Sequence, residues 1–259
     1  MEITVDGLKV RYRISGEGNS ALVILQGWGT SFEAYDPIMR LLAPHMLVVQ
    51  FDFPGFGKSQ EPPEAWSVSQ YTDFFIKLMS ELGLEKAVLL GHSYGGRVII
   101  DLCSRDASTL PFKVERLVLV DAAGILPQRT DAQKRRIARY KRLKKFFAFP
   151  PVYALFKEPI EQWKSKQGSE DYRNATPLMR QALVKAVNED LSDRLPLIKQ
   201  ETLLIWGDQD TATPLSDGEK MDELIPDSGL AVVHGAGHFS YLDQPIVFNN
   251  ILKSYFKIK

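Results

Sequence analysis

Cysteine is almost absent from this chain, since only Cys103 among its 259 residues carries a thiol. A lone cysteine cannot form an internal disulfide, and no cluster of cysteine and histidine has the spacing of a zinc site. The sequence therefore predicts a protein without metal or organic cofactor. A reducing compartment suits such a chain, and we expect it to be cytoplasmic.

Long apolar runs and an excess of charge are missing as well. Residues 1–15 alternate between polar and apolar side chains, unlike the apolar core of a secretory signal. No stretch approaches the roughly 18 apolar residues that a membrane-spanning helix needs. The 32 basic residues are balanced by 32 acidic residues. Because nucleic-acid-binding proteins usually carry a basic excess, we expect no nucleic-acid partner.

The chain does contain short apolar segments that alternate with segments of helical period. The expected strands are 10–15, 21–26, 46–51, 87–90, 117–120, 202–206 and 230–233, and the clearest expected helices are 69–82, 94–104 and 244–256. Strands that alternate with helices predict an α/β fold, with a mostly parallel central sheet flanked by helices. In such sheets a ligand binds beyond the carboxyl ends of the strands, so residues directly after each strand are candidate site residues.

One interval, residues 125–196, lacks strand-like segments and is helical, basic and aromatic in character. About seventy residues are too many for a structureless loop within a compact domain. We therefore predict a helical cap over 125–196, inserted into a core formed by residues 1–124 and 197–259.

Within this predicted cap, residues 129–145 carry nine basic side chains and a single acid, Asp131. Apolar residues recur there at helical spacing, which predicts an amphipathic helix with a cationic face. A solvated surface helix is one interpretation of it. The alternatives are attraction of an anionic ligand and contact with an acidic membrane surface.

The motif Gly91-His92-Ser93-Tyr94-Gly95 comes directly after one expected strand and directly before an expected helix. In this context G-x-S-x-G is typical of a sharp turn that holds a serine in a strained backbone conformation and exposes its hydroxyl. Gly91 and Gly95 are expected to support the turn, because a Cβ there would collide with neighbouring backbone. Ser93 is therefore the candidate nucleophile.

A serine nucleophile needs a general base, and the chain has four histidines. His45 precedes a strand and should lie at the far edge of the sheet, while His92 should point away from Ser93. His238 follows the strand 230–233 by way of small residues, which favours it as the base. His234, at the strand end itself, remains the alternative.

The imidazole also needs a carboxylate that fixes its tautomer. Asp210 is favoured because it lies further beyond the strand 202–206 than Asp208, which we interpret as a turn residue that binds backbone amides. Asp121, after the strand 117–120, is the alternative acid. The two amide donors for an oxyanion are expected from Tyr94, directly after the nucleophile, and from Trp28 in the loop that begins with Gly27.

With these motifs in order along the chain, the sequence resembles the α/β-hydrolase superfamily, and the similarity extends over nearly the whole chain. The segment from Asp52 to Ser59 is similar to the D-x-P-G-x-G-x-S turn of many members, to which we assign no catalytic role. Many members have His-Gly where this chain has Gln26-Gly27. Because the oxyanion donors are backbone amides, this difference should leave the mechanism intact.

The resemblance implies a cap-bearing serine hydrolase that cleaves an ester or related acyl bond through an acyl-enzyme. Its expected partner is a small molecule with an apolar or aromatic acyl group. Two alternatives keep the same three catalytic residues, namely hydrolysis of a carbon–carbon bond and a lyase reaction. A third alternative is a ligand-binding receptor that keeps the fold without turnover.

Overall fold

The computed structural model describes residues 1–126 and 169–258, with positions 135, 138, 139, 142, 143, 146, 147, 149 and 159 between them. By its internal contacts the chain divides into two compact units, 1–126 with 181–259 and 127–180. Of the predicted cap, 33 of its 72 residues lie outside the described residues, as do 12 of the 17 residues of the basic stretch 129–145, so both stay predictions.

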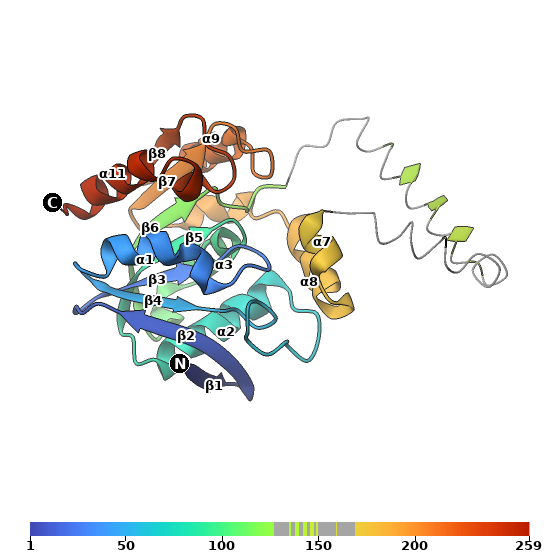
Figure 1. Cartoon of the computed structure of the whole chain (residues 1–259), viewed down its shortest axis with the longest axis horizontal. Helices are drawn as coiled ribbons and strands as arrows, with labels where there is room; N and C mark the ends of the chain where they lie inside the picture. The colour runs from blue at the N-terminus through green and yellow to red at the C-terminus, as the bar shows by residue number, and fades with distance from the viewer. Residues whose placement is uncertain are drawn as a thin grey trace. The chain divides into compact units, whose positions relative to one another are not determined.

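The first unit contains a sheet of eight strands, and its order is β1-β2-β4-β3-β5-β6-β7-β8 (Figure 1). The strands are β1 (Glu2–Val5), β2 (Leu8–Ser15), β3 (Ala21–Leu25), β4 (Leu47–Phe51), β5 (Lys86–His92), β6 (Lys113–Val120), β7 (Thr202–Gly207) and β8 (Ser228–Val233). Strand β2 pairs antiparallel with β1 and β4, while the strands from β4 to β8 pair parallel. The predicted α/β fold class is confirmed.

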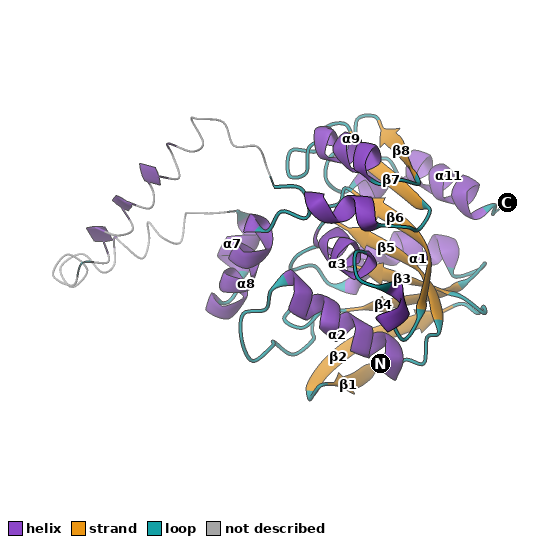
Figure 2. Ribbon diagram, turned by 180° about the vertical axis from the view of Figure 1, so that it is seen from behind, coloured by secondary structure: helices purple, strands orange, loops and turns teal. Residues whose placement is uncertain are grey.

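Helices cover both faces of this sheet. The helical elements are η1 (Phe32–Tyr35), α1 (Asp36–Leu42), α2 (Val68–Glu81), α3 (Tyr94–Cys103), η2 (Ala107–Thr109), α7 (Glu170–Asn174), α8 (Pro177–Asn188), η3 (Ser192–Leu197), α9 (Leu215–Leu224), α10 (Ser240–Asp243) and α11 (Pro245–Phe256). Helices α1 and α11 lie on the face seen in Figure 1, and α2, α3 and α9 lie on the face seen in Figure 2. None of the described helices is long and apolar enough to cross a bilayer.

Apolar side chains point alternately to both faces of the central strands, and this explains why both faces of the sheet need a covering layer of helices. Leu22 and Ile24 of β3 belong to one buried cluster, which includes Phe248 and Leu252 of α11. Val23 and Leu25, which alternate with them, are equally buried and point to the opposite face. Strands that are apolar on both sides fold stably only between two helical layers.

The loop after β4 contains Asp52, the first residue of the D-x-P-G-x-G-x-S turn. One oxygen of its buried carboxylate accepts the amide of Phe32 at 2.7 Å, and the other accepts the amide of Lys58 at 3.0 Å. Both contacts are to backbone, so Asp52 joins the loop after β3 to the loop after β4 and stabilises the edge of the sheet where the candidate site lies.

Candidate active site

Ser93 lies between the end of β5 and the start of α3, as the motif predicts. Its backbone angles are φ 50° and ψ −112°, which an L-residue rarely adopts. The conformation is held in place by hydrogen bonds: the Ser93 amide donates to the carbonyl of Val120 at 3.1 Å, and the Ser93 carbonyl accepts the amide of Ala123 at 2.9 Å. The predicted strain at the nucleophile turn is therefore present, and it leaves the Ser93 side chain partly exposed.

The glycines of the turn are packed against neighbouring backbone. A Cβ on Gly95 would overlap the carbonyl oxygen of Leu25 in β3, and a Cβ on Gly91 would lie 2.8 Å from the carbonyl carbon of Gly95. Real Cβ atoms do not approach backbone so closely, so α3 can begin this near to β3 and β5 only with glycine at these positions.

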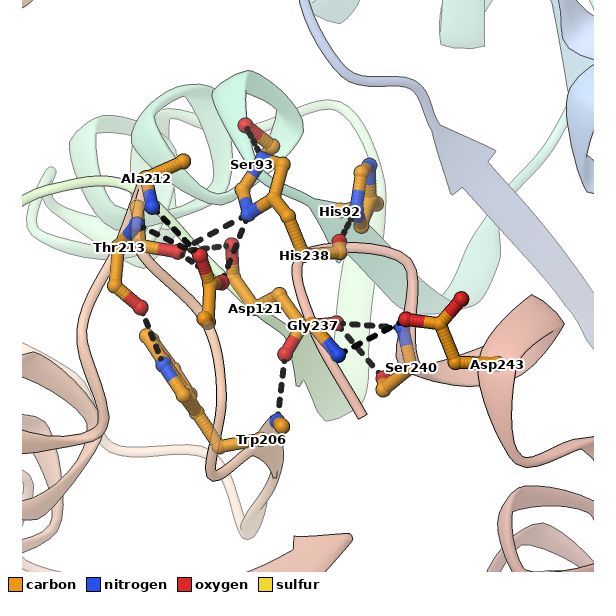
Figure 3. Close-up of polar contacts among 12 residues, drawn as sticks. His92, Ser93, Asp121, Trp206, Ala212, Thr213, Gly237, His238, Ser240 and Asp243 are labelled. Atoms are coloured by element: carbon orange, nitrogen blue, oxygen red, sulfur yellow. Dashed lines mark hydrogen bonds and ion pairs between the residues drawn. The ribbon is translucent and has the colours of Figure 1, made fainter. Parts of the chain in front are cut away.

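His238 reaches Ser93 from the loop after β8, as Figure 3 shows. Its Nε2 lies 2.9 Å from Ser93 Oγ, and its Nδ1 lies 2.7 Å from Asp210 Oδ2. Since the ionised carboxylate can only accept, Nδ1 carries the proton and Nε2 is free to accept the serine hydroxyl. This arrangement can move a proton from Ser93 to His238 while Asp210 stabilises the imidazolium that forms.

Asp210 is anchored from four directions. Its Oδ1 accepts the amides of Ala212 at 2.7 Å and Thr213 at 3.0 Å, and its Oδ2 accepts the Thr213 hydroxyl at 2.7 Å besides His238. Burial acts to raise the pKa of this carboxyl, but the hydrogen bonds from His238 and Thr213 outweigh burial and hold the pKa below its ordinary value. The carboxylate is therefore ionised and has one orientation.

Asp121, the alternative acid, has partners other than His238. The carboxylate of Asp121 accepts the amide of Gly207 at 2.8 Å and the amide of Ser240 at 3.1 Å, and burial raises its pKa to about 6. It thus ties the loops after β7 and β8 together without bonding His238.

Asp208 accepts the amide of Gly235 at 2.8 Å, in agreement with its interpretation as a turn residue. It also pairs at 3.0 Å with His234, whose side chain is 86% exposed. His45 lies in the turn before β4 and is exposed, at the other end of that strand. Of the four histidines, the structure brings His238 to the serine hydroxyl.

The two predicted oxyanion donors follow β3 and β5, which pair as neighbours in the sheet. Trp28 follows β3 and Tyr94 begins α3, and their rings meet edge to face with centroids 5.0 Å apart. Among the described residues, no protein acceptor bonds the backbone amide of Trp28 or Tyr94. Both amides are therefore free to bind a substrate oxygen, and Trp28 as a whole residue is 8% exposed.

Sequence reasoning missed two residues that shape this site. Thr213 orients Asp210, and the signal was present, since aspartate often binds amides two and three residues ahead. His92 was set aside because it cannot reach Ser93. It instead contacts the carbonyl of His238 at 2.7 Å, which no sequence pattern indicates.

Comparisons with known proteins agree with the fold. Residues 20–245 match the family model for the alpha/beta hydrolase fold. The chain is 24% identical to 2-hydroxy-6-oxo-2,4-heptadienoate hydrolase of Pseudomonas putida, over 98% of this chain and 94% of that protein.

Among solved structures, an esterase from Exiguobacterium antarcticum is 26% identical with a TM-score of 0.76, covering 99% of this chain and 98% of the esterase. A meta-cleavage product hydrolase from Pseudomonas fluorescens is 25% identical with a TM-score of 0.73, covering 99% of this chain and 97% of that one. Because the family match covers most of the chain, this protein belongs to the α/β-hydrolase fold family and is a hydrolase of that fold.

Proposed function

We propose that this protein hydrolyses an ester or related acyl bond with Ser93 as nucleophile, His238 as general base and Asp210 as the carboxylate that orients it. The observation that carries the proposal is the unbroken chain of hydrogen bonds from Ser93 Oγ through His238 to Asp210, at 2.9 and 2.7 Å. Both distances are within the range that proton transfer requires.

The reaction has two halves. Ser93 Oγ bonds to the acyl carbon while its proton passes to His238 Nε2, and the amides of Trp28 and Tyr94 stabilise the oxyanion. The bond to the leaving oxygen then breaks, and that oxygen takes the proton from His238. In the second half, His238 takes a proton from water, the resulting hydroxide attacks the acyl-enzyme, and the proton returns to Ser93. The products are a carboxylic acid and an alcohol.

The proposed substrate is a small molecule with an apolar or aromatic acyl group. Two aromatic rings pack on the ring of Trp28, namely Phe56 at 4.8 Å and Tyr94 at 5.0 Å between centroids. The loop that carries the Trp28 amide therefore has apolar surroundings, which favour an apolar acyl group over a charged one.

Hydrolysis of a carbon–carbon bond is the second candidate. It is favoured by the likeness to 2-hydroxy-6-oxo-2,4-heptadienoate hydrolase, because the compound in that name has a ketone and a carboxylate but no ester. The same serine, histidine and aspartate would serve, with a carbon leaving group in place of an oxygen.

The test uses Ser93→Ala beside the wild type, with a fluorophosphonate probe and a panel of p-nitrophenyl esters of increasing acyl length. The wild type should hydrolyse esters and gain the mass of one phosphonyl group, whereas Ser93→Ala should do neither. His234→Ala is the matched control, because it removes a histidine of the neighbouring loop that does not contact Ser93.

Each remaining outcome has a separate meaning. Ester turnover that survives in Ser93→Ala would refute the proposal. Turnover of a 6-oxo-dienoate with esters left intact would favour carbon–carbon hydrolysis. Tight ligand binding without turnover of either substrate would favour the receptor.

A further inference from the structure

Three loops of the site meet at two buried side chains outside the Ser93–His238–Asp210 chain. The amide of Gly27, in the loop after β3, contacts Tyr35 Oη at 2.6 Å. Tyr35 Oη lies 2.9 Å from Nδ1 of His92, and Nε2 of His92 lies 2.7 Å from the carbonyl oxygen of His238. Tyr35 is fully buried and His92 is 1% exposed.

Hydrogen-bonding chemistry fixes the direction of each proton in this set. A carbonyl oxygen can only accept, so Nε2 of His92 must donate to His238. Burial, followed by the nearby charge of His238, lowers the pKa of His92 to about 3, so the ring is neutral and its Nδ1 has no proton. Tyr35 therefore donates its hydroxyl proton to Nδ1, and its oxygen accepts the amide of Gly27.

These contacts lead from Gly27 through Tyr35 and His92 to His238, and the residue at each end adjoins or belongs to a group that the reaction uses. Gly27 directly precedes Trp28, whose amide is a proposed oxyanion donor. The carbonyl at the other end belongs to His238 itself, whereas three carboxylates hold backbone amides of its neighbours: Asp208 accepts that of Gly235, Asp243 that of Gly237 and Asp121 that of Ser240. Figure 3 shows the His92 contact together with Gly237, Asp243, Ser240 and Asp121.

Close packing around the His92 ring leaves the loop of Gly27 and the loop of His238 little freedom to move separately. A Cβ on Gly27 would lie 2.9 Å from Nδ1 of His92, so the Gly27 backbone lies directly against the ring. The rings of His92 and His238 have centroids 5.0 Å apart. A shift of about 1 Å at a reacting group can cost about 100-fold in rate, so contacts that hold both loops against one ring bear directly on catalysis.

We propose that His92 and Tyr35 are positioning residues that hold the base loop and the oxyanion loop in register with Ser93. They act through the backbone of His238 and Gly27 and touch no reacting atom. This inference rests on the proposed function, because it assigns the two side chains to the machinery of that reaction.

Four single variants and one double variant test it by steady-state ester hydrolysis. Tyr35→Phe removes only the hydroxyl, and His92→Phe removes both ring nitrogens. His92→Gln keeps an amide donor that can reach the carbonyl of His238. Tyr255→Phe is the matched control, because it also removes a tyrosine hydroxyl that forms a hydrogen bond, here to the backbone carbonyl of Leu117, but on α11 away from the site.

The expected result is a loss of kcat with little change in KM. His92→Phe should lower kcat by about 10-fold to 100-fold and Tyr35→Phe by about 10-fold, since the acyl group still binds while the reacting groups are misplaced. His92→Gln should recover most of the loss, and Tyr255→Phe should match the wild type. The double variant His92→Phe with Tyr35→Phe should be no slower than His92→Phe alone, because both changes interrupt one set of contacts.

Wild-type kcat in folded Tyr35→Phe and His92→Phe would overturn the inference, and so would losses that multiply in the double variant. If His92→Phe does not fold, Tyr35→Phe and His92→Gln decide the question. A nitrogen-15 spectrum of the histidine rings gives a readout independent of turnover. Tyr35→Phe should shift the ring signals of His238 as well as those of His92. Unchanged ring signals of His238 would count against the proposal that Tyr35 and His92 position the loop of His238.

The two proposals fail in different ways. Absence of turnover in the wild type, or its survival in Ser93→Ala, would refute the proposed function, and the spectra would still test the coupling. Turnover that depends on Ser93 but not on His92 or Tyr35 would refute only the further inference.

Discussion

Replacement of Asp210 by asparagine should trap His238 in the wrong tautomer. The two amides on Oδ1, from Ala212 and Thr213, are fixed in the backbone at 2.7 and 3.0 Å. An asparagine therefore keeps its carbonyl oxygen there and turns its NH2 group toward His238. Nδ1 of His238 would then accept a hydrogen bond from this NH2 group, so the proton of the neutral ring would lie on Nε2, where it faces Ser93. That nitrogen could no longer accept the serine proton.

The size of the expected loss in kcat follows from the free energy needed to turn the side-chain amide of the asparagine over. Turning the asparagine over would restore the reactive tautomer but would leave two backbone amides without an acceptor, at about 1–3 kcal/mol each. The active orientation thus lies about 2–6 kcal/mol higher, and at about 1.4 kcal/mol for each tenfold change kcat should fall by about 30-fold to 10⁴-fold. The two side chains have the same shape, so the fold should remain intact.

The assay compares kcat for p-nitrophenyl ester hydrolysis at neutral pH, with the melting temperature as a check on folding. Asp208→Asn is the matched control, because Asp208 also pairs with a histidine, His234, but at an exposed position away from Ser93. It should keep wild-type kcat. A folded Asp210→Asn protein with kcat close to that of the wild type would show that Asp210 does not set the tautomer of His238.

Three further predictions concern two residues around the site and the buried thiol at the far end of α3. Gly95→Ala should destabilise the protein by at least about 3 kcal/mol in urea denaturation, because the added Cβ would overlap the carbonyl oxygen of Leu25. Gly229→Ala should be tolerated, because nothing lies within 4 Å of the Cβ added there. Equal stability of the two variants would contradict this reasoning. Burial raises the pKa of the folded Asp121 carboxyl from its ordinary 3.8 to about 6, so ionisation of this group destabilises the folded state as the pH rises between these values. The unfolding free energy of the wild type, taken relative to that of Asp121→Asn, should therefore fall by up to about 3 kcal/mol from pH 4 to pH 7. A difference that stays constant with pH would refute the shift. Burial raises the pKa of the Cys103 thiol to about 12, so a disulfide reagent should label it only after unfolding, and rapid labelling of the native protein would show that the thiol is accessible.

Much of the fold was predictable because its signals are local. The predicted strands 21–26 and 202–206 correspond to β3 and β7 within one residue, since apolar β-branched segments bounded by turns are typical of buried strands. The elements that were missed have weaker local patterns. Helix α9 contains a glycine and several charged residues, and β1 is a short strand at the sheet edge.

The candidate site was predictable in part for the same reason. The strand, turn and helix around Ser93 are encoded in eighteen consecutive residues, 86–103, and the small residues before His238 indicate a loop beyond the strand end. His92 shows the limit of this reasoning. The alternation of side chains correctly directed it away from Ser93, but its partners come from η1 and from the loop after β8, which are far apart in the sequence.

The sequence by itself therefore determined the parallel sheet, the nucleophile turn and the two loops that carry an acid and a base. One of those loops offers two aspartates and the other two histidines, and the pairs Asp208 with His234 and Asp210 with His238 have nearly equal spacing. Only the tertiary structure decided which pair reaches the serine, and that His92 joins the base loop to the oxyanion loop. The physical reason is that local residue patterns fix which backbone conformations are favourable, whereas the distance between side chains on different loops depends on how the whole sheet packs.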